Sequence, residues 1–220
     1  MSKYKAIIFD MDGTIVDSER LWKEVNKVYL NSHNVYEEQL IEKIYEEIRG
    51  LSDHKIPGII KKFVQINESE EELIKNLSSL ANKFLKEKKL SFIKGFKEFF
   101  EKVKKLNIPV AIATNATISG LRETSEALFL HEFFGEHMYS MECVGRVCKP
   151  SPDVYIHAAK QINIDPKYCI AIEDSAFGVT AAVNAGMYCI AIDSAKIRNK
   201  LQHANLIIDD YSEINLNDFF

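Results

Sequence analysis

The sequence lacks a long apolar run, and it is poor in cysteine. No stretch of 18 apolar residues occurs among its 220 residues, so we expect a soluble protein without a membrane-spanning helix. The apolar run near the N-terminus covers only four residues before an acid, which is too short for the apolar core of a signal peptide. The four cysteines are Cys143, Cys148, Cys169 and Cys189; they form no CxxC pair, and two of them lie in apolar runs. This pattern predicts reduced thiols and a cytoplasmic location.

The chain also lacks an excess of charge of either sign. It has 28 basic and 32 acidic residues, and its formal net charge is −4. This balance gives no support for binding to nucleic acid or to an anionic membrane, so a small molecule is the expected partner. With 46% hydrophobic residues, the chain can bury a full core as one large domain or as one domain with an insertion.

Short, nearly continuous apolar runs predict strands that are buried on both faces of a parallel sheet. Patterns with helical spacing lie between these runs, including one over residues 96–106 and another over residues 175–184. Ser151, Pro152 and Asp153 are typical of a helix start, with Ser151 as the expected N-cap. Alternation of strands and helices predicts a doubly wound, Rossmann-like α/β fold. The predicted strands are residues 6–9, 110–113, 169–172 and 188–192, with a weaker run at 206–208.

Residues 18–91 interrupt this alternation, because they contain only helical patterns with outer faces rich in Lys and Glu. We therefore expect two domains: an α/β core made of residues 1–17 and 92–220, and an all-helical cap made of residues 18–91. An insertion of this size after the first strand is typical of a lid over a site at the end of a sheet.

Acidic residues follow two of the predicted strands. Asp10 and Asp12 end the first strand in the segment IIFDMDGTIVDS, and Glu173 and Asp174 end another far along the chain. Because parallel strands bring their carboxyl ends to one edge of the sheet, we expect these four carboxylates to lie together. Such a group needs a cation, and Mg²⁺ prefers oxygen ligands. Taken singly, each acidic pair could instead serve a tight turn or cap a helix.

Four motifs occur in order at the predicted strand ends. They are Asp10-Met11-Asp12-Gly13-Thr14, Thr114-Asn115, Lys149-Pro150 and Glu173-Asp174. This set resembles the motifs of the haloacid dehalogenase-like hydrolase superfamily over nearly all of the core domain. The helical insertion resembles, in position and size, the C1-type cap of the branch that contains β-phosphoglucomutase and sugar-phosphate or pseudouridine phosphatases.

The resemblance implies a phosphate-monoester hydrolase that works through an aspartyl-phosphate. Asp10 would be the nucleophile, and Asp12 the general acid and base. Mg²⁺ would be bound by the side chains of Asp10 and Asp174, by the backbone carbonyl of Asp12, and by Glu173 directly or through a water.

The same resemblance assigns the phosphoryl contacts. Thr114 and the backbone N–H of Asn115 would hold the phosphoryl oxygens, and Lys149 would stabilise charge on the transferring group. Selection of the substrate would fall to the cap. The turn that contains Arg49 and Ser52 is the candidate there, although it could also be an ordinary connection between helices.

Other activities of the same family fit the sequence less well. Asp12 argues against a dehalogenase, because a halide leaving group needs no proton. The mutases of the branch carry a histidine at the start of the cap, and an ungapped alignment places Trp22 there in this chain. That departure favours a phosphatase over a β-phosphoglucomutase-like mutase, which stays as the alternative.

Two non-enzymatic alternatives fit part of this pattern. A receiver-like signalling module has an acidic metal pocket as well, but it is about half this length and lacks both the cap and an acid at the position of Asp12. A catalytically inactive binding protein with the same fold stays as an alternative, although every motif residue is intact. The expected partner is a small phosphate ester, and the expected state is a monomer.

Overall fold

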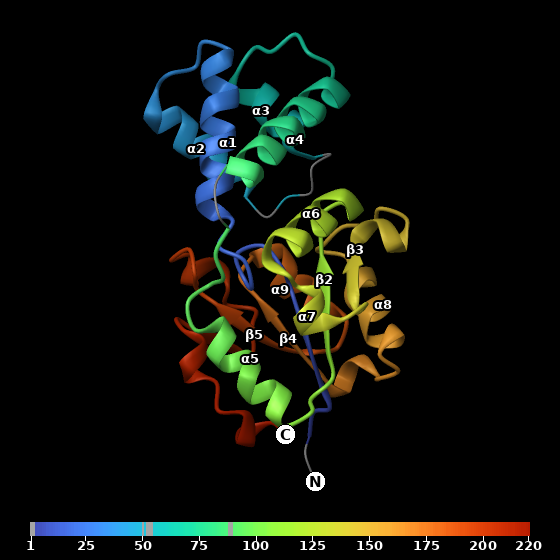
Figure 1. The fold of residues 1–220 in the computed structure, drawn as a ribbon. Helices are drawn as coiled ribbons and strands as arrows, with labels where there is room; N and C mark the ends of the chain where they lie inside the picture. The colour runs from blue at the N-terminus through green and yellow to red at the C-terminus, as the bar shows by residue number, and fades with distance from the viewer. Residues whose placement is uncertain (1–2, 50, 52–54, 88–89) are drawn as a thin grey trace. The chain divides into compact units, whose positions relative to one another are not determined.

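A computed structural model describes residues 3–49, 51, 55–87 and 90–220. The chain forms two compact units (Figure 1): Met1–Asp17 together with Ser91–Phe220, and Ser18–Leu90. We call them the core unit and the cap unit. The second junction lies one residue before the boundary that the sequence suggested.

The core unit contains a six-stranded, fully parallel sheet in the order β3-β2-β1-β4-β5-β6. The doubly wound α/β class predicted from the sequence is therefore confirmed. The strands are β1 (Ala6–Phe9), β2 (Val110–Thr114), β3 (Met138–Ser140), β4 (Cys169–Glu173), β5 (Tyr188–Ile192) and β6 (Leu206–Ile208). Of the strands in the described residues, only β3 was missed, because a three-residue edge strand with two partly exposed residues and a buried serine carries no continuous apolar run.

The register of the central strands brings the motif residues to one edge. In β1, Phe9 pairs with Ile112 of β2 on one side and with Ile172 of β4 on the other. The next residue after Phe9 is Asp10, and the next after Ile172 is Glu173. The first and last motifs are thus neighbours in space because β1 and β4 are adjacent strands.

Small side chains line one face of the sheet and let two helices pack closely against it. Ala6 and Ile8 of β1 share a buried cluster with residues of α8 (Asp153–Gln161) and α9 (Ala176–Asn184). Helix α9 begins as expected, with Ser175 as its N-cap. Helix α8 begins later than expected: Pro152, not Ser151, is its cap residue, and the Ser151 hydroxyl contacts the Asp153 carboxylate instead.

The opposite face of the sheet is covered by aromatic side chains. Phe9 packs edge-on against Phe96 at a centroid distance of 5.9 Å and against Phe134 at 5.6 Å. These two residues belong to α5 (Phe96–Lys105) and α7 (His131–Phe134). Helix α6 (Ile118–Leu128) and short 3₁₀ turns complete the core unit; the turns are Met141–Val144, Pro166–Tyr168, Arg198–Lys200, Tyr211–Glu213 and Leu216–Asp218.

The only regular elements in the described residues of the cap unit are helices, joined by short connections. Its helices are α1 (Glu19–Ser32), α2 (Glu38–Ile48), α3 (Ile56–Phe63) and α4 (Glu70–Glu87). They enclose a separate apolar cluster that includes Leu21, Val25, Ile44, Ile60 and Leu73. The cap unit therefore has a hydrophobic core of its own.

Candidate active site

Asp10 lies directly beyond β1 and is held there by the sheet. Its backbone N–H donates to the Ile172 carbonyl at 2.9 Å, and 7% of the residue is exposed. The chain then folds into a tight loop, in which the Met11 carbonyl accepts hydrogen bonds from Ile15 and Val16. Asp10 and the half-buried Asp12 thus lie at the start of this loop, where β1 ends.

Gly13 in this loop is required by the approach of another motif residue. It adopts a left-handed conformation with φ = +80°, and a Cβ there would lie 2.2 Å from Oδ2 of Asp174. A side chain would displace the Asp174 carboxylate. The glycine thus lets the first and fourth motifs meet.

Three buried carboxylates converge at this edge of the sheet. Asp10, Glu173 and Asp174 each present an oxygen, and these oxygens all lie within 4.8 Å of one another. The three residues are predicted metal ligands from two strands far apart in sequence, and the fold brings them together.

Lys149 reaches the same cluster from the loop before α8. Its Nζ atom lies 2.6 Å from Oδ1 of Asp10 and 2.6 Å from Oε1 of Glu173, and its side chain is 2% exposed. The Lys149-Pro150 peptide bond is cis. Because so little water reaches the ammonium group, both ion pairs act in a medium that screens them weakly.

Burial and mutual repulsion determine the protonation of these groups. Burial raises the pKa of Asp10 well above its usual value, against the lowering effect of Lys149, and the charges of Glu173 and Asp174 raise it further. Burial lowers the pKa of Lys149, but the carboxylates of Asp10 and Glu173 outweigh it, and the net shift is upward. Lys149 is therefore a permanent cation at neutral pH.

The charge count of the cluster fits a divalent cation. Three buried carboxylates (Asp10, Glu173, Asp174) against one buried ammonium (Lys149) leave −3 + 1 = −2 when all are ionised. An uncompensated buried charge is costly, so a doubly charged cation is the natural complement. Oxygen ligands of this kind suit a hard cation.

Glu173 is surrounded by protein donors. Its Oε2 accepts hydrogen bonds from the backbone N–H groups of Asp174 and Ser175, at 3.0 and 3.2 Å, and from the Ser175 hydroxyl at 3.1 Å. Its carboxylate lies against Gly178 of α9, where a Cβ would come within 1.8 Å of Oε1. The sequence indicated no role for Gly178, because a glycine within a helix carries no signal of what packs against it.

The second motif contacts the third through its side chains. The Asn115 Oδ1 atom accepts a hydrogen bond from the Lys149 backbone N–H at 2.9 Å, so Asn115 helps to place the lysine. The Thr114 hydroxyl is buried and accepts from the Ala116 N–H at 3.0 Å. Both residues lie where β2 ends, which is the edge that holds Asp10.

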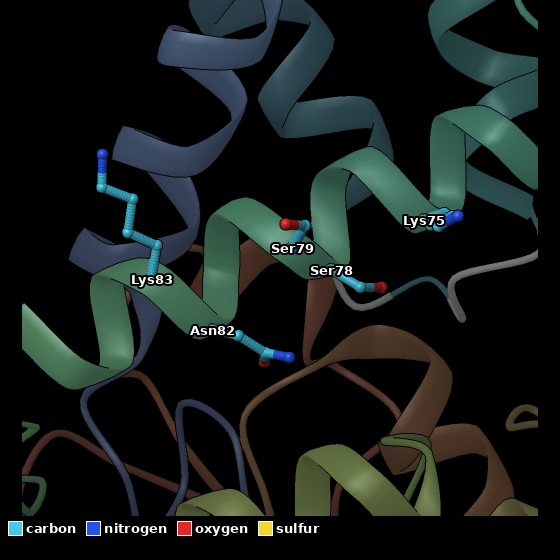
Figure 2. Close-up of a pocket in the computed structure, with 5 residues that line it drawn as sticks. All are labelled: Lys75, Ser78, Ser79, Asn82 and Lys83. Atoms are coloured by element: carbon cyan, nitrogen blue, oxygen red, sulfur yellow. The ribbon is translucent and has the colours of Figure 1, made fainter.

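Of the two cap residues singled out from the sequence, the structure describes only Arg49. Arg49 follows α2, with its Nη2 atom 3.8 Å from Oε2 of Glu19. Ser52 lies outside the described residues. Figure 2 shows a polar hollow along α4, lined by Lys75, Ser78, Ser79, Asn82 and Lys83. The sequence analysis did not single out any of these five residues.

Comparison with known proteins identifies the family. Residues 7–192 match the sequence model of the family described as haloacid dehalogenase-like hydrolase. The chain belongs to this family. The match extends from β1 to the end of β5, so it includes all four motifs. It identifies the chain as a hydrolase of this family and excludes a receiver module.

Relatives of this hydrolase include named phosphatases. A phosphorylated carbohydrates phosphatase of Thermotoga maritima is 28% identical over 183 residues, which cover 83% of this chain and 82% of the relative. A probable pseudouridine-5'-phosphatase of Drosophila melanogaster is 25% identical, with coverage of 100% and 95%. In fold, the hydrolase is similar to a solved HAD family hydrolase of Deinococcus radiodurans, with a TM-score of 0.79, 23% identity and coverage of 99% and 96%.

None of the helices in the described residues is long and apolar enough to cross a membrane. Cys143, Cys169 and Cys189 are free thiols, and the last two are buried in strands.

Proposed function

We propose that this hydrolase is a Mg²⁺-dependent phosphatase of small phosphate monoesters, such as a sugar phosphate or a nucleoside monophosphate. The observation that carries the proposal is the buried cluster of Asp10, Glu173, Asp174 and Lys149, whose charge is −2 when all four groups are ionised. This arrangement suits the transfer of a dianionic phosphoryl group, which needs both a nucleophile and concentrated positive charge.

Hydrolysis would proceed in two displacements at phosphorus. In the first, an oxygen of Asp10 forms a bond to phosphorus while the ester P–O bond breaks, and Asp12 donates a proton to the leaving alkoxide. In the second, water attacks phosphorus, Asp12 takes a proton from it, and the bond between phosphorus and Asp10 breaks. Inorganic phosphate leaves, and both aspartates return to their starting states.

Metal binding falls to the acidic groups at the sheet edge. Asp10 and Asp174 would supply carboxylate oxygens, Asp12 its backbone carbonyl, and Glu173 further negative charge, directly or through a water. When bound, Mg²⁺ would neutralise charge that develops on the phosphoryl oxygens.

The remaining motif residues would hold the phosphoryl group. Lys149 is a fixed positive charge beside Asp10, at 2.6 Å from its Oδ1. Thr114 and the backbone N–H of Asn115 would donate hydrogen bonds to phosphoryl oxygens from the end of β2. We further propose that the cap unit selects the substrate, with Arg49 and Ser52 as candidates, and that the enzyme is a cytoplasmic monomer.

The phosphatase names of the relatives from Thermotoga maritima and Drosophila melanogaster support hydrolysis over a mutase reaction. The residue at the start of the cap supports it too: Trp22 stands where the mutases carry a histidine, and it lacks a group able to shuttle a proton.

The proposal is tested by phosphate release from a panel of sugar phosphates and nucleoside monophosphates. We expect activity that a chelator abolishes and that Mg²⁺ restores. Asp10→Asn should lower kcat at least about 10³-fold, because an amide is a far weaker nucleophile. Full activity of Asp10→Asn, or of the chelated enzyme, would refute the mechanism. Conversion of a sugar 1-phosphate to an isomeric sugar phosphate without release of phosphate would favour the mutase.

A further inference from the structure

Tyr155 is a fully buried residue of α8 that the motifs do not include. Its hydroxyl donates a hydrogen bond to Oε1 of Glu173 at 2.9 Å and lies 3.3 Å from Nζ of Lys149. The Lys149 ammonium also lies 4.6 Å from the centre of the Tyr155 ring. The tyrosine therefore contacts the lysine through both its ring and its hydroxyl group.

These contacts match the donors of the lysine. An ammonium group has three N–H donors. The Nζ atom has three acceptors around it: Oδ1 of Asp10, Oε1 of Glu173 and the hydroxyl oxygen of Tyr155. Because the Tyr155 hydroxyl gives its own proton to Glu173, its oxygen is available to accept from Lys149.

Glu173 in turn is fixed by other donors. Its second oxygen, Oε2, is held by the backbone of Asp174 and by Ser175, and its carboxylate rests against Gly178. Tyr155 thus connects the lysine to a carboxylate that has little freedom to move.

The Lys149 ammonium group needs a contact of this kind to fix its position. Its four-carbon stem is flexible, and a compact ammonium charge has no preferred direction of its own. The oxygens of Asp10, Glu173 and Asp174 all lie within 4.8 Å of one another, so each attracts the same ammonium group. The Tyr155 hydroxyl favours the position between Asp10 and Glu173.

We propose that Tyr155 is a positioning residue that holds Lys149 beside the nucleophile Asp10, and that it acts on catalysis only through Lys149. The inference rests on the proposed phosphatase function. It assigns a role to a residue of α8 outside the four motifs.

The test compares kcat and KM of the whole enzyme with those of Tyr155→Phe, with Mg²⁺ present. Phenylalanine keeps the ring and removes only the hydroxyl group. We expect kcat to fall about 5- to 20-fold, as for one lost hydrogen bond to charged groups, while KM changes less than about twofold. In the background of Lys149→Met, the same substitution should leave kcat unchanged.

Tyr29→Phe is the matched control. Tyr29 is a buried tyrosine of the cap unit whose hydroxyl also donates to a carboxylate, Glu68, at 2.9 Å. This variant loses the same type of hydrogen bond, so its melting temperature should fall as for Tyr155→Phe. Its kcat should stay within about twofold of the unsubstituted enzyme, because loss of one hydrogen bond leaves the folded state dominant.

Three results would overturn the role proposed for Tyr155. An unchanged kcat in Tyr155→Phe, or an equal fall in the presence and absence of Lys149, would overturn the positioning role while the phosphatase proposal stands. A fall in kcat for Tyr29→Phe as large as for Tyr155→Phe would also overturn it. If the unsubstituted enzyme released no phosphate from any ester, the proposed function would fail, and this inference with it.

Discussion

Lys149 is the residue on which the charge balance of the site depends, because it is the buried cation between two buried carboxylates. Its ion pairs differ in kind from those on the surface. Lys167, for example, lies 2.9 Å from Asp165, but its side chain is 61% exposed. Solvent and salt screen that exposed pair, whereas the pairs of Lys149 are hidden from both.

We expect Lys149→Met to lower kcat by about 10²- to 10³-fold, the usual cost of a lost electrostatic contact in an active site. Loss of the cation also leaves Asp10 and Glu173 uncompensated, which should lower the free energy of unfolding by about 3–5 kcal/mol. Phosphate release and urea unfolding in metal-free buffer measure the two effects. In the control, Lys167→Met, kcat should stay near that of the unsubstituted enzyme, and the free energy of unfolding should change by less than about 0.5 kcal/mol. Equal behaviour of the two variants would contradict the assigned role.

At the scale of elements, α9 approaches β4 so closely that its third residue has room for no side chain. A Cβ on Gly178 would lie 1.8 Å from Oε1 and 1.9 Å from the carboxyl carbon of Glu173. Alanine would ordinarily favour a helix over glycine by about 1 kcal/mol. Here the overlap outweighs that gain, because Glu173 is held by Lys149 and Ser175 and has nowhere to move.

We therefore expect Gly178→Ala to destabilise the protein by about 1–3 kcal/mol and to lower kcat at least about tenfold. Gly58→Ala in α3 is the matched control, because nothing lies within 4 Å of a Cβ built there. That variant should gain about 0.5–1 kcal/mol and keep its activity. Chemical unfolding and phosphate release would measure both variants. A stable, fully active Gly178→Ala enzyme would show that the helix has more freedom than the structure indicates.

Helix α5 is held to the sheet by its aromatic face. Phe96 is fully buried, stacks on Phe92 at 5.3 Å and meets Tyr211 edge-on at 5.8 Å. We expect Phe96→Ala to cost about 3–5 kcal/mol of unfolding free energy through lost burial and a cavity. Leu106→Ala, at the end of the same helix and 52% exposed in the parent, should cost less than about 0.5 kcal/mol. Urea denaturation of the two variants would measure these changes in unfolding free energy. Similar losses in both variants would contradict the packing described for Phe96.

At the scale of the whole molecule, the cap unit has its own source of acid sensitivity. Burial raises the pKa of Glu68, but hydrogen bonds from Tyr29, Asn76 and His33 outweigh it and lower the pKa below its ordinary value of 4.5. The folded cap thus favours the ionised carboxylate. This stabilisation is present above pH 4.5 and is lost as the pH falls through the lower, folded pKa.

Thermal unfolding followed by the fluorescence of Trp22 would measure this loss. Trp22 is the single tryptophan of the sequence and packs against the cap cluster. Between pH 5 and pH 3, the unsubstituted protein should lose more stability than Glu68→Gln, which cannot titrate at this position. The same pH dependence in both proteins would show that other carboxylates dominate.

Much of the fold and of the candidate site could be predicted from the sequence. The buried strands were recognisable because a parallel strand covered on both faces has a continuous apolar run, as in residues 169–172. The motif acids were recognisable because they follow such runs directly. Edge strand β3 was missed for the opposite reason, since it has only three residues, of which two are partly exposed and the third is a serine. Tyr155 and Gly178 were missed because each looks like an ordinary helix residue.

The sequence by itself determined the alternation of most strands and helices, the helical insertion, and the types of chemical group that the strand ends carry. These follow from local periodicity and from neighbours along the chain. Only the tertiary structure decided which groups meet: β4 lies beside β1, and α8 lies against both strands. Contacts such as that of Tyr155 with Lys149 and Glu173 depend on the packing of separate elements in three dimensions, and no local pattern of residues encodes that packing.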